Sequence, residues 1–384
     1  MRILALLVGL AAAQNPPWAS TYNMSLSTIF MPCDANGVGP IPFPPETAAQ
    51  WGISDWDWSN GRSWYSKQTP MNCEETLLAQ AEATLALNAA SKQFVYRNAI
   101  KALPWFTAVR EKLENPAYWP WFLPYKNCTH YECGPNATQN LYHDFLQTPR
   151  GDCGAGVECG EYLFDLRNDS ARAWLRSEYI LGPTGLGSPA IHGFYFDDGW
   201  NSAGPTEEDP GAVEACGLSP QDVEDMIAAY KLSYEEKINV TIANGGFVFD
   251  KFNSPSPPNI TSAPLVCAPF LREYCGPQSP SQTGPMLLQF SRNNHTHPWP
   301  LPFPDQDLAT FLLVRGDFGW IGYGWAGCFS PDTYTRPPGL DVDYGTPLNF
   351  CAETAKGSGV FVRNYTKADV ALDCNSFSPS IVVK

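Results

Sequence analysis

Short apolar, aromatic-rich runs alternate along the chain with stretches of helical periodicity. The clearest run extends from Ile191 to Phe196 and stops at two adjacent acids, Asp197 and Asp198, and its composition predicts a buried strand. Similar runs predict further strands at residues 51–60, 94–98, 162–166, 240–244, 264–269 and 320–325. Amphipathic stretches between them predict helices at residues 73–87, 104–114, 170–179, 219–236 and 305–315. Seven or eight alternating units of this kind are typical of parallel α/β folds and favour a (β/α)8 barrel.

The beginning of the chain departs from this alternation. It has a basic start, a short apolar run and a small-residue end at Ala13, which together predict a secretory signal peptide. After it, no segment is apolar for long enough to span a membrane. We therefore expect a secreted protein, or one of the endomembrane lumen.

The rest of the chain divides into three parts. A stretch rich in proline and glycine predicts an extended lead-in, the alternating units predict the barrel, and a final pattern of alternating apolar residues predicts a hairpin. That hairpin would close or flank the barrel. The predicted boundaries are 1–13 for the signal peptide, 14–48 for the lead-in, 49–350 for the barrel and 351–384 for the C-terminal β segment.

The cysteines agree with secretion. There are twelve, an even number, and their spacing does not match the closely spaced pairs of a zinc site. In an oxidising compartment we expect all of them in disulfides, with no free thiol. The candidates are Cys33, Cys73, Cys128, Cys133, Cys153, Cys159, Cys216, Cys267, Cys275, Cys328, Cys351 and Cys374.

Glycosylation sequons are also present, and their use requires an exposed asparagine. Asn168 and Asn239 lie beside predicted strands, so we do not expect every sequon to be used. The candidates are Asn23, Asn127, Asn136, Asn259, Asn294 and Asn364.

Composition excludes one class of partner. The net charge of −15 does not suit nucleic acid, because phosphate binding requires a basic surface. Hydrophobic residues make up 44% of the chain, which is enough for a packed core without a partner, and we expect a monomer.

Polar side chains stand at the predicted carboxyl ends of the strands, which converge at one face of a parallel barrel. Acids, amides and tryptophans in one cleft suit a sugar ring: carboxyls act on the glycosidic bond, amides bind hydroxyls and aromatic faces stack on the ring. No metal or organic cofactor is implied. The residues that we expect to bind a carbohydrate are Asp57, Arg97, Asn98, Asp165, Asp198, Asn244 and Trp325.

The stretch from Gly193 to Asp198 resembles the fourth-strand motif of glycoside-hydrolase-type TIM barrels, in which a glycine-aromatic strand ends in the nucleophile. The segment at residues 359–373 resembles the C-terminal β segment of secreted, poorly characterised proteins of this type. The resemblance covers roughly residues 50–375 in element order. It implies hydrolysis of an oligo- or polysaccharide, with Asp197 as nucleophile and Glu273, at a later strand end, as acid/base.

This mechanism sets requirements on both carboxyls. The nucleophile must be ionised, and we expect a nearby Arg97 to lower the pKa of Asp197. The acid must be protonated, and we expect an apolar setting for Glu273 with Phe270, Leu271 and Tyr274 as its walls.

Two alternatives remain open. A catalytically degenerate barrel would keep the aromatic residues and bind carbohydrate or act at the cell surface without cleaving it. A metal-dependent hydrolase would use Asp197, Asp198 and a histidine. The chain has five histidines, and His295 and His297 lie in a predicted loop, which makes the metal hypothesis weaker.

Overall fold

Seven parallel strands form a closed barrel at the centre of the protein. The computed structural model describes residues 22–34, 36–126, 140–144, 149, 151–198, 210–253, 262–283, 287–290, 303–326 and 336–384. In these ranges the barrel strands are β1 (Thr28–Pro32), β2 (Ile53–Trp56), β3 (Lys92–Asn98), β9 (Gly193–Asp197), β10 (Phe247–Asn253), β11 (Leu287–Phe290) and β12 (Gly319–Ala326), and β12 pairs with β1 to close the ring. The fold is mixed α/β, as expected, but the described residues supply seven barrel strands and not eight.

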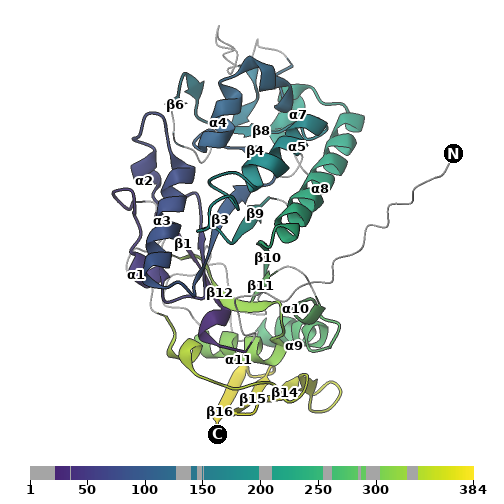
Figure 1. Cartoon of the computed structure of the whole chain (residues 1–384). Coiled ribbons are helices and arrows are strands. Elements are labelled where there is room, and N and C mark those ends of the chain that lie inside the picture. Colours follow the sequence, from purple (N-terminus) through teal and green to yellow (C-terminus); the bar gives the residue numbers. More distant parts are fainter. Residues whose placement is uncertain are drawn as a thin grey trace, which may run out of the picture.

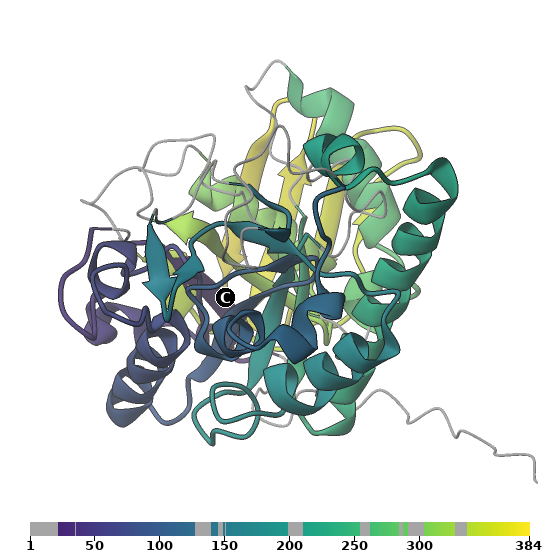
Figure 2. The same cartoon turned by 90° about the horizontal axis from the view of Figure 1, so that it is seen from above.

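Helices cover the outside of the barrel (Figures 1 and 2). The longest is α8, which begins after Ser219 with a capping box between Ser219 and Asp222 and a proline at its first position. The described helices are α1 (Pro45–Ala48), α2 (Arg62–Tyr65), α3 (Cys73–Leu87), α4 (Thr107–Leu113), α5 (Asp169–Trp174), α7 (Pro210–Cys216), α8 (Pro220–Ala243), α9 (Ala263–Tyr274), α10 (Pro280–Thr283) and α11 (Pro304–Val314). Shorter helical turns are Ser25–Ser27, Pro116–Trp121, Leu175–Ile180 and Pro338–Asp341.

An insertion between β3 and β9 lies over the carboxyl ends of these strands (Figure 1). It contains an antiparallel sheet of β4 (Lys101–Ala102), β8 (Glu161–Leu163) and β5 (His143–Asp144). A ribbon of β6 (Asp152–Gly154) and β7 (Val157–Glu158) is tied by the Cys153–Cys159 disulfide. The strand predicted at 162–166 therefore belongs to this insertion and not to the barrel.

Two other predicted strands are helical. Residues 240–243 continue α8, whose buried side includes Lys237 and Thr241 one helical turn apart, and residues 264–269 lie inside α9. Both are short apolar runs, whose periodicity does not separate a strand from a buried helix. The actual strands, β10 and β11, start later in the chain. The barrel also starts earlier than residue 49, because β1 lies inside the predicted lead-in.

Close packing inside the barrel depends on one glycine. A Cβ atom at Gly193 would lie 2.3 Å from the carbonyl oxygen of Phe247 and 2.7 Å from the ring of Phe94. Gly193 is in register with both of these residues, on the two strands that flank β9. The small residue thus lets three strands approach at one level.

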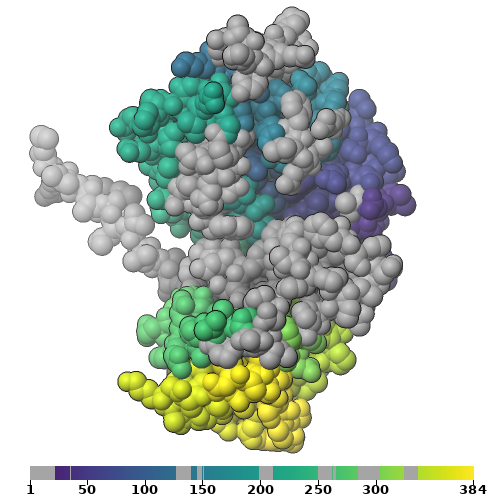
Figure 3. All heavy atoms as spheres, turned by 180° about the vertical axis from the view of Figure 1, so that it is seen from behind, coloured from purple at the N-terminus to yellow at the C-terminus, as the bar shows by residue number. Residues whose placement is uncertain are grey.

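The C-terminal residues form an antiparallel sheet that flanks the barrel and does not complete it. Its strands are β13 (Ala352–Glu353), β14 (Val360–Asn364), β15 (Ala368–Asp373) and β16 (Ser378–Val383). The sheet packs on α11 and, in the view from behind, forms the end of the molecule away from the insertion (Figure 3).

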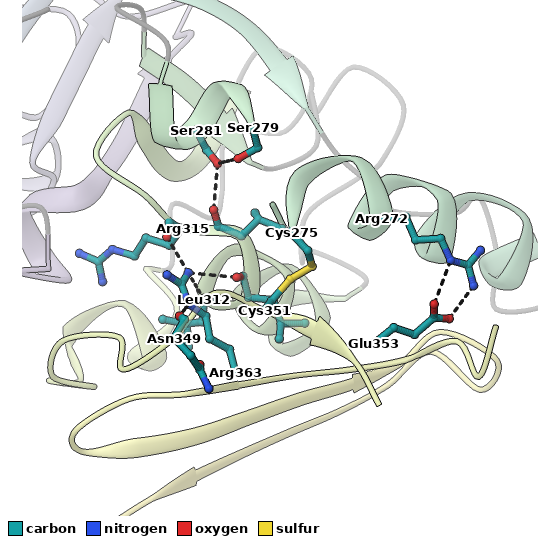
Figure 4. Close-up of a disulfide and its surroundings, with 12 residues drawn as sticks. Arg272, Cys275, Ser279, Ser281, Leu312, Arg315, Asn349, Cys351, Glu353 and Arg363 are labelled. Carbon is teal, nitrogen blue, oxygen red and sulfur yellow. Dashed lines mark hydrogen bonds and ion pairs between the residues drawn. A yellow bond between two sulfur atoms is a disulfide. The ribbon is translucent and has the colours of Figure 1, made fainter. Parts of the chain in front are cut away.

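Figure 4 shows how this sheet is attached. The Cys275–Cys351 and Cys267–Cys374 disulfides link it to α9 and the turn after it. Beside them the guanidinium of Arg363 donates to the carbonyls of Leu312, Leu313 and Arg315 at the end of α11. Carbonyls at the end of a helix lack hydrogen-bond donors within the helix, and Arg363 supplies these donors.

The expectation that every cysteine is paired is wrong. Three disulfides are described and Cys33 is disulfide-bonded as well, but Cys73 is a buried free thiol. Cys73 is the first residue of α3, and its thiol lies beside the carbonyl of Trp58. Cys153 and Cys159 are bonded to each other and not to Cys73. Cys216 ends α7. Cys128, Cys133 and Cys328 lie outside the described residues.

Two of the six candidate glycosylation asparagines lie among the described residues. Asn23 and Asn364 are exposed, whereas Asn127, Asn136, Asn259 and Asn294 lie outside the described ranges. In the part of the chain that the structure describes, no helix combines the length and apolar character needed to cross a membrane.

Candidate active site

Four carboxyl groups gather at the carboxyl ends of β2 and β9. They belong to Asp55, Asp57, Asp197 and Asp198, and burial, followed by the negative charges within this group, raises the pKa of Asp55 and of Asp197. Parallel strands bring their carboxyl ends to one face of a barrel, so residues distant in sequence meet there. Asp57 and Asp197 therefore lie at the same end of the barrel, as the sequence predicted.

Asp197 is held by two phenols. The hydroxyl of Tyr96 donates to Oδ2 at 2.9 Å, and that of Tyr195 donates to Oδ1 at 3.1 Å. Tyr195 precedes Asp197 by two residues on β9 and therefore shares its face, and Tyr96 is the register partner of Tyr195 on β3. The backbone N–H of Asp198 also donates to Oδ1, at 3.1 Å. Both carboxyl oxygens are thus oriented.

The pKa of Asp197 is raised to about 8, first by burial of the carboxyl and then by the negative charges of Asp198 and Asp57. The hydrogen bonds from Tyr96 and Tyr195 act in the opposite direction and lower it, but they do not prevail. Protein atoms crowd the carboxyl, although the residue keeps part of its surface exposed at the strand end. At neutral pH this carboxyl is therefore mostly protonated.

Arg97 does not lower the pKa of Asp197, contrary to expectation. It follows Tyr96 on β3 and so points to the outer side of the strand. There it lies 3.2 Å from Glu74 of α3 and donates to the carbonyl of Thr184 at 2.8 Å. Arg97 is fully buried in this packing layer, which gives it a structural place outside the site.

Asp198 lies among polar groups of the β3–β4 turn. Its φ of +60° is a left-handed conformation that Asp tolerates better than most residues, and it ends the strand. Its Oδ2 accepts a hydrogen bond from Nδ2 of Asn98 at 2.7 Å and lies 3.6 Å from the ammonium of Lys101. Lys101 also pairs with Glu161 at 3.1 Å. The turn therefore places a positive charge beside Asp198.

Asp55 and Asp57 differ in how they are satisfied. Asp57 is buried and accepts hydrogen bonds from the backbone N–H of Ser59, at 2.8 Å, and from the Ser59 hydroxyl. Asp55 is fully buried, and neither of its oxygens has a hydrogen-bond partner among the described residues. Burial, and then the charges of Asp57 and Asp197, raise the pKa of Asp55 well above its ordinary value. Asp55 therefore holds its proton to higher pH than an ordinary aspartic acid.

Several predicted site residues lie elsewhere. Asp165 follows β8 in the insertion and forms a two-pronged ion pair with Arg167. Asn244 caps the end of α8, is exposed and donates to the carbonyl of Val240. The expectation that these two residues join the barrel cleft is wrong for the same reason that the strands at 162–166 and 240–244 were misassigned. For Trp325, which falls in β12, the side chain lies outside the description.

Glu273 is not at a strand end. It is exposed on α9 near the end of that helix, on the path toward the amino end of β11. The rings of Phe270 and Tyr274 stack on each other, and Leu271 is buried. These side chains therefore do not form an apolar pocket around the exposed carboxyl of Glu273. The prediction of Glu273 as acid/base depended on a strand that is a helix.

Tyr96, Tyr195, Lys101 and Glu161 contribute to the site and were not predicted. Tyr195 could have been found, because it shares the strand phase of Asp197. The other three reach the site through the pairing of β3 with β9 and of β4 with β8, which no local pattern reveals.

The described side chains include no group of three that could hold a metal ion. His295 and His297, which the metal-dependent hypothesis considered, lie outside the described residues. A separate cavity of about 510 Å³ is lined by Tyr22, Asn23 and the turn at Thr366 and Lys367, next to the amino end of β1 and thus at the other end of the barrel from Asp197.

Comparison with known proteins gives a consistent but distant likeness. No family model matches the chain, and a search of curated proteins finds no match. Among solved structures, Bacillus licheniformis trehalose-6-phosphate hydrolase is similar at a TM-score of 0.40 and 9% identity, over 82% of this chain and 65% of that one. The Nostoc punctiforme debranching enzyme is similar at a TM-score of 0.45 and 11% identity, over 95% of this chain and 89% of that one. Cyclic α-maltosyl-(1→6)-maltose hydrolase from Arthrobacter globiformis is similar at a TM-score of 0.45 and 10% identity, over 96% of this chain and 98% of that one.

Proposed function

We propose that the protein is a secreted glycoside hydrolase that cleaves an oligo- or polysaccharide with the carboxyls of Asp197 and Asp198. The observation that carries this proposal is the contrast between these two neighbours. Asp197 is a buried acid whose raised pKa keeps it protonated, and Asp198 lies beside the ammonium of Lys101. Two carboxyls in contrasting environments are the usual basis of an acid/base assignment. The described disulfides are compatible with secretion.

Each carboxyl has a role in this proposal. Cleavage requires a proton for the departing oxygen and a carboxylate that stabilises the positive charge developing at the anomeric carbon. Asp197, oriented by Tyr96 and Tyr195, donates the proton as the bond between the anomeric carbon and that oxygen breaks. Asp198 supplies the carboxylate, water bonds to the anomeric carbon in place of the departing oxygen, and its surplus proton passes to a carboxylate of the pair. The strand motif implied a nucleophile at Asp197, but a nucleophile must be ionised, and the raised pKa favours the acid role.

Other residues would support the reaction. Asn98 donates to both Asp198 and the hydroxyl of Tyr96, and so links the two carboxyls through one amide. Asp57 adds negative charge that keeps the proton on Asp197. Asp57 and Asn98 thus keep a place in the site, whereas Arg97, Asp165, Asn244 and Glu273 do not enter the proposed mechanism.

The test compares aryl glycosides that differ in the leaving group. Asp197→Asn should lose about 10²–10⁴-fold in kcat/KM on substrates whose poor leaving group needs a proton, and far less on dinitrophenyl glycosides, which need none. Asp198→Asn should lose activity on both. Asp369→Asn, on the C-terminal sheet, is the matched control and should behave as wild type.

Each other outcome has a clear meaning. Equal losses on both substrate classes would return Asp197 to the nucleophile role. Full activity of Asp197→Asn would remove it from the mechanism. A wild type that binds glycans and cleaves none across a broad panel would support the non-catalytic carbohydrate-binding alternative.

A further inference from the structure

Helix α8 buries a lysine behind the site. Lys237 is fully buried, and its Nζ donates to the carbonyl of Ala99 at 2.9 Å. Ala99 directly follows the end of β3, so this hydrogen bond joins the outer helix to the turn that leaves the barrel. Lys231, on the same helix, is exposed and provides a natural comparison.

Ala99 also makes a backbone hydrogen bond to the end of β9. Its N–H donates to the backbone carbonyl of Asp197 at 2.9 Å. A single residue, through its two flanking peptide groups, therefore connects Lys237 of α8 with the end of β9. Displacement of this residue would move the backbone of Asp197 and the β3–β4 turn together.

That turn carries the groups that contact Asp198. Oδ1 of Asn98 accepts from the backbone N–H groups of Ile100 and Lys101, at 2.9 and 2.6 Å, and these bonds fix the turn. The amide nitrogen of Asn98 and the ammonium of Lys101 then reach the Asp198 carboxyl. The positions of the Asn98 amide and the Lys101 ammonium therefore depend on the turn to which Lys237 donates a hydrogen bond.

Burial of a lysine at this position costs free energy. An ammonium loses its hydration on burial, and among the described residues one carbonyl accepts from Lys237 where three N–H donors are available. Burial accordingly lowers the pKa of Lys237 to about 7, and the negative charge of Glu236 acts in the opposite direction. An apolar side chain of the same length would avoid this penalty. Residues that reduce stability beside a site are typical of a function that needs them.

We propose that Lys237 is a positioning residue of the active site, which sets the β3–β4 turn so that Asn98 and Lys101 meet Asp198. For its catalytic consequence this inference rests on the proposed glycosidase function. The positioning itself can be measured without any substrate.

The test is Lys237→Met, which keeps the length of the side chain and removes its donor, with Lys231→Met as the control. Amide hydrogen exchange in a peptide covering residues 96–101 should become roughly tenfold faster in Lys237→Met and stay unchanged in the control. On a cleaved substrate, kcat should fall by about tenfold or more while KM changes little, because the misplaced turn acts on the reacting groups. If Lys237→Met does not fold, Lys237→Gln, which keeps a shorter donor, replaces it.

The two parts of the test separate the two proposals. Unchanged exchange in the Lys237 variant overturns the inference whether or not the protein is an enzyme. Faster exchange with unchanged kcat shows a structural contact without a positioning role and also overturns it. A wild type without activity counts against the proposed function alone, and the exchange measurement still decides whether Lys237 fixes the turn.

Discussion

The hydroxyl of Tyr96 and the carboxyl of Asp197 meet across two neighbouring parallel strands, with Oη donating to Oδ2 at 2.9 Å. The contact follows from register, because Tyr96 lies opposite Tyr195 and Asp197 is the next residue on the same face. Hydrogen bonds to an ionised carboxylate favour that form, so the phenol lowers a pKa that burial and neighbouring charges raise.

Removing this phenol should change the pH dependence of activity. In Tyr96→Phe the pKa of Asp197 should rise, because a donor to its ionised form is lost. If protonated Asp197 is the acid, activity falls as the pH rises through this pKa, so the basic limb should move upward by about 0.5–1 unit. The measurement is kcat/KM against pH. Tyr344→Phe, which removes a hydroxyl bonded to Gly339 near the other end of the barrel, should leave the limb in place. An unmoved limb in Tyr96→Phe would contradict the role of Asp197.

Asp55 should make the protein less stable as the pH rises. Its pKa in the folded protein is well above the ordinary value of 3.8, so between these two values the folded state holds a proton that the unfolded state releases. The contribution to the free energy of unfolding is complete below the unfolded pKa and is lost as the pH rises through the folded pKa.

Asp55→Asn removes this contribution. The difference in Tm between about pH 5 and about pH 8 should therefore be smaller in the variant than in wild type, and the variant should be the more stable of the two at the higher pH. Thermal unfolding at both pH values measures this. Asp169→Asn, whose side chain is 90% exposed, is the control. The same pH dependence in Asp55→Asn as in wild type would show that Asp55 does not take up a proton on folding.

Gly193→Ala should destabilise the barrel. The added Cβ would lie 2.3 Å from a backbone oxygen, which cannot move without displacing β10, so we expect a loss of about 1–3 kcal/mol in the free energy of unfolding. Denaturant unfolding measures it. In Gly276→Ala the new Cβ meets no atom within 4 Å, and that variant should be close to wild type.

Cys73 should react only after unfolding. The buried thiol has a raised pKa, which disfavours the reactive thiolate. Titration of unreduced protein in denaturant should detect this thiol, and Cys73→Ser should lower the count by one per chain. An equal count in the two proteins would show that Cys73 is paired.

The sequence located the fourth barrel strand correctly, although two errors cancelled. β1 was missed because proline and glycine surround it, and residues 162–166 were counted in its place although they pair within the insertion. The run at 193–197 was recognisable because its aromatic residues, its glycine and its terminal acids all occur within one short stretch. The local sequence pattern was sufficient to predict that strand, but it was not sufficient to predict which segments form the closed barrel.

The candidate site was partly predictable for related reasons. Asp57, Asn98, Asp197 and Asp198 follow strands that were recognised, and they lie together. Glu273 and Asn244 depended on runs that are helical, so their predicted positions were wrong. Arg97 could have been excluded by its phase, since it alternates with Asn98 on one strand. The phenol of Tyr96 needed the register between strands that lie about a hundred residues apart, and a single sequence does not contain it.

The disulfide between Cys275 and Cys351 spans 76 residues, a stretch that contains β11, α11 and β12. A protease that cuts anywhere between these two cysteines leaves two pieces that are still one covalent molecule. The Cys267–Cys374 bond closes a second loop around the first. More than a quarter of the chain, 107 of 384 residues, can therefore be cut without either fragment being able to diffuse away, and the severed strands remain beside their partners in the barrel.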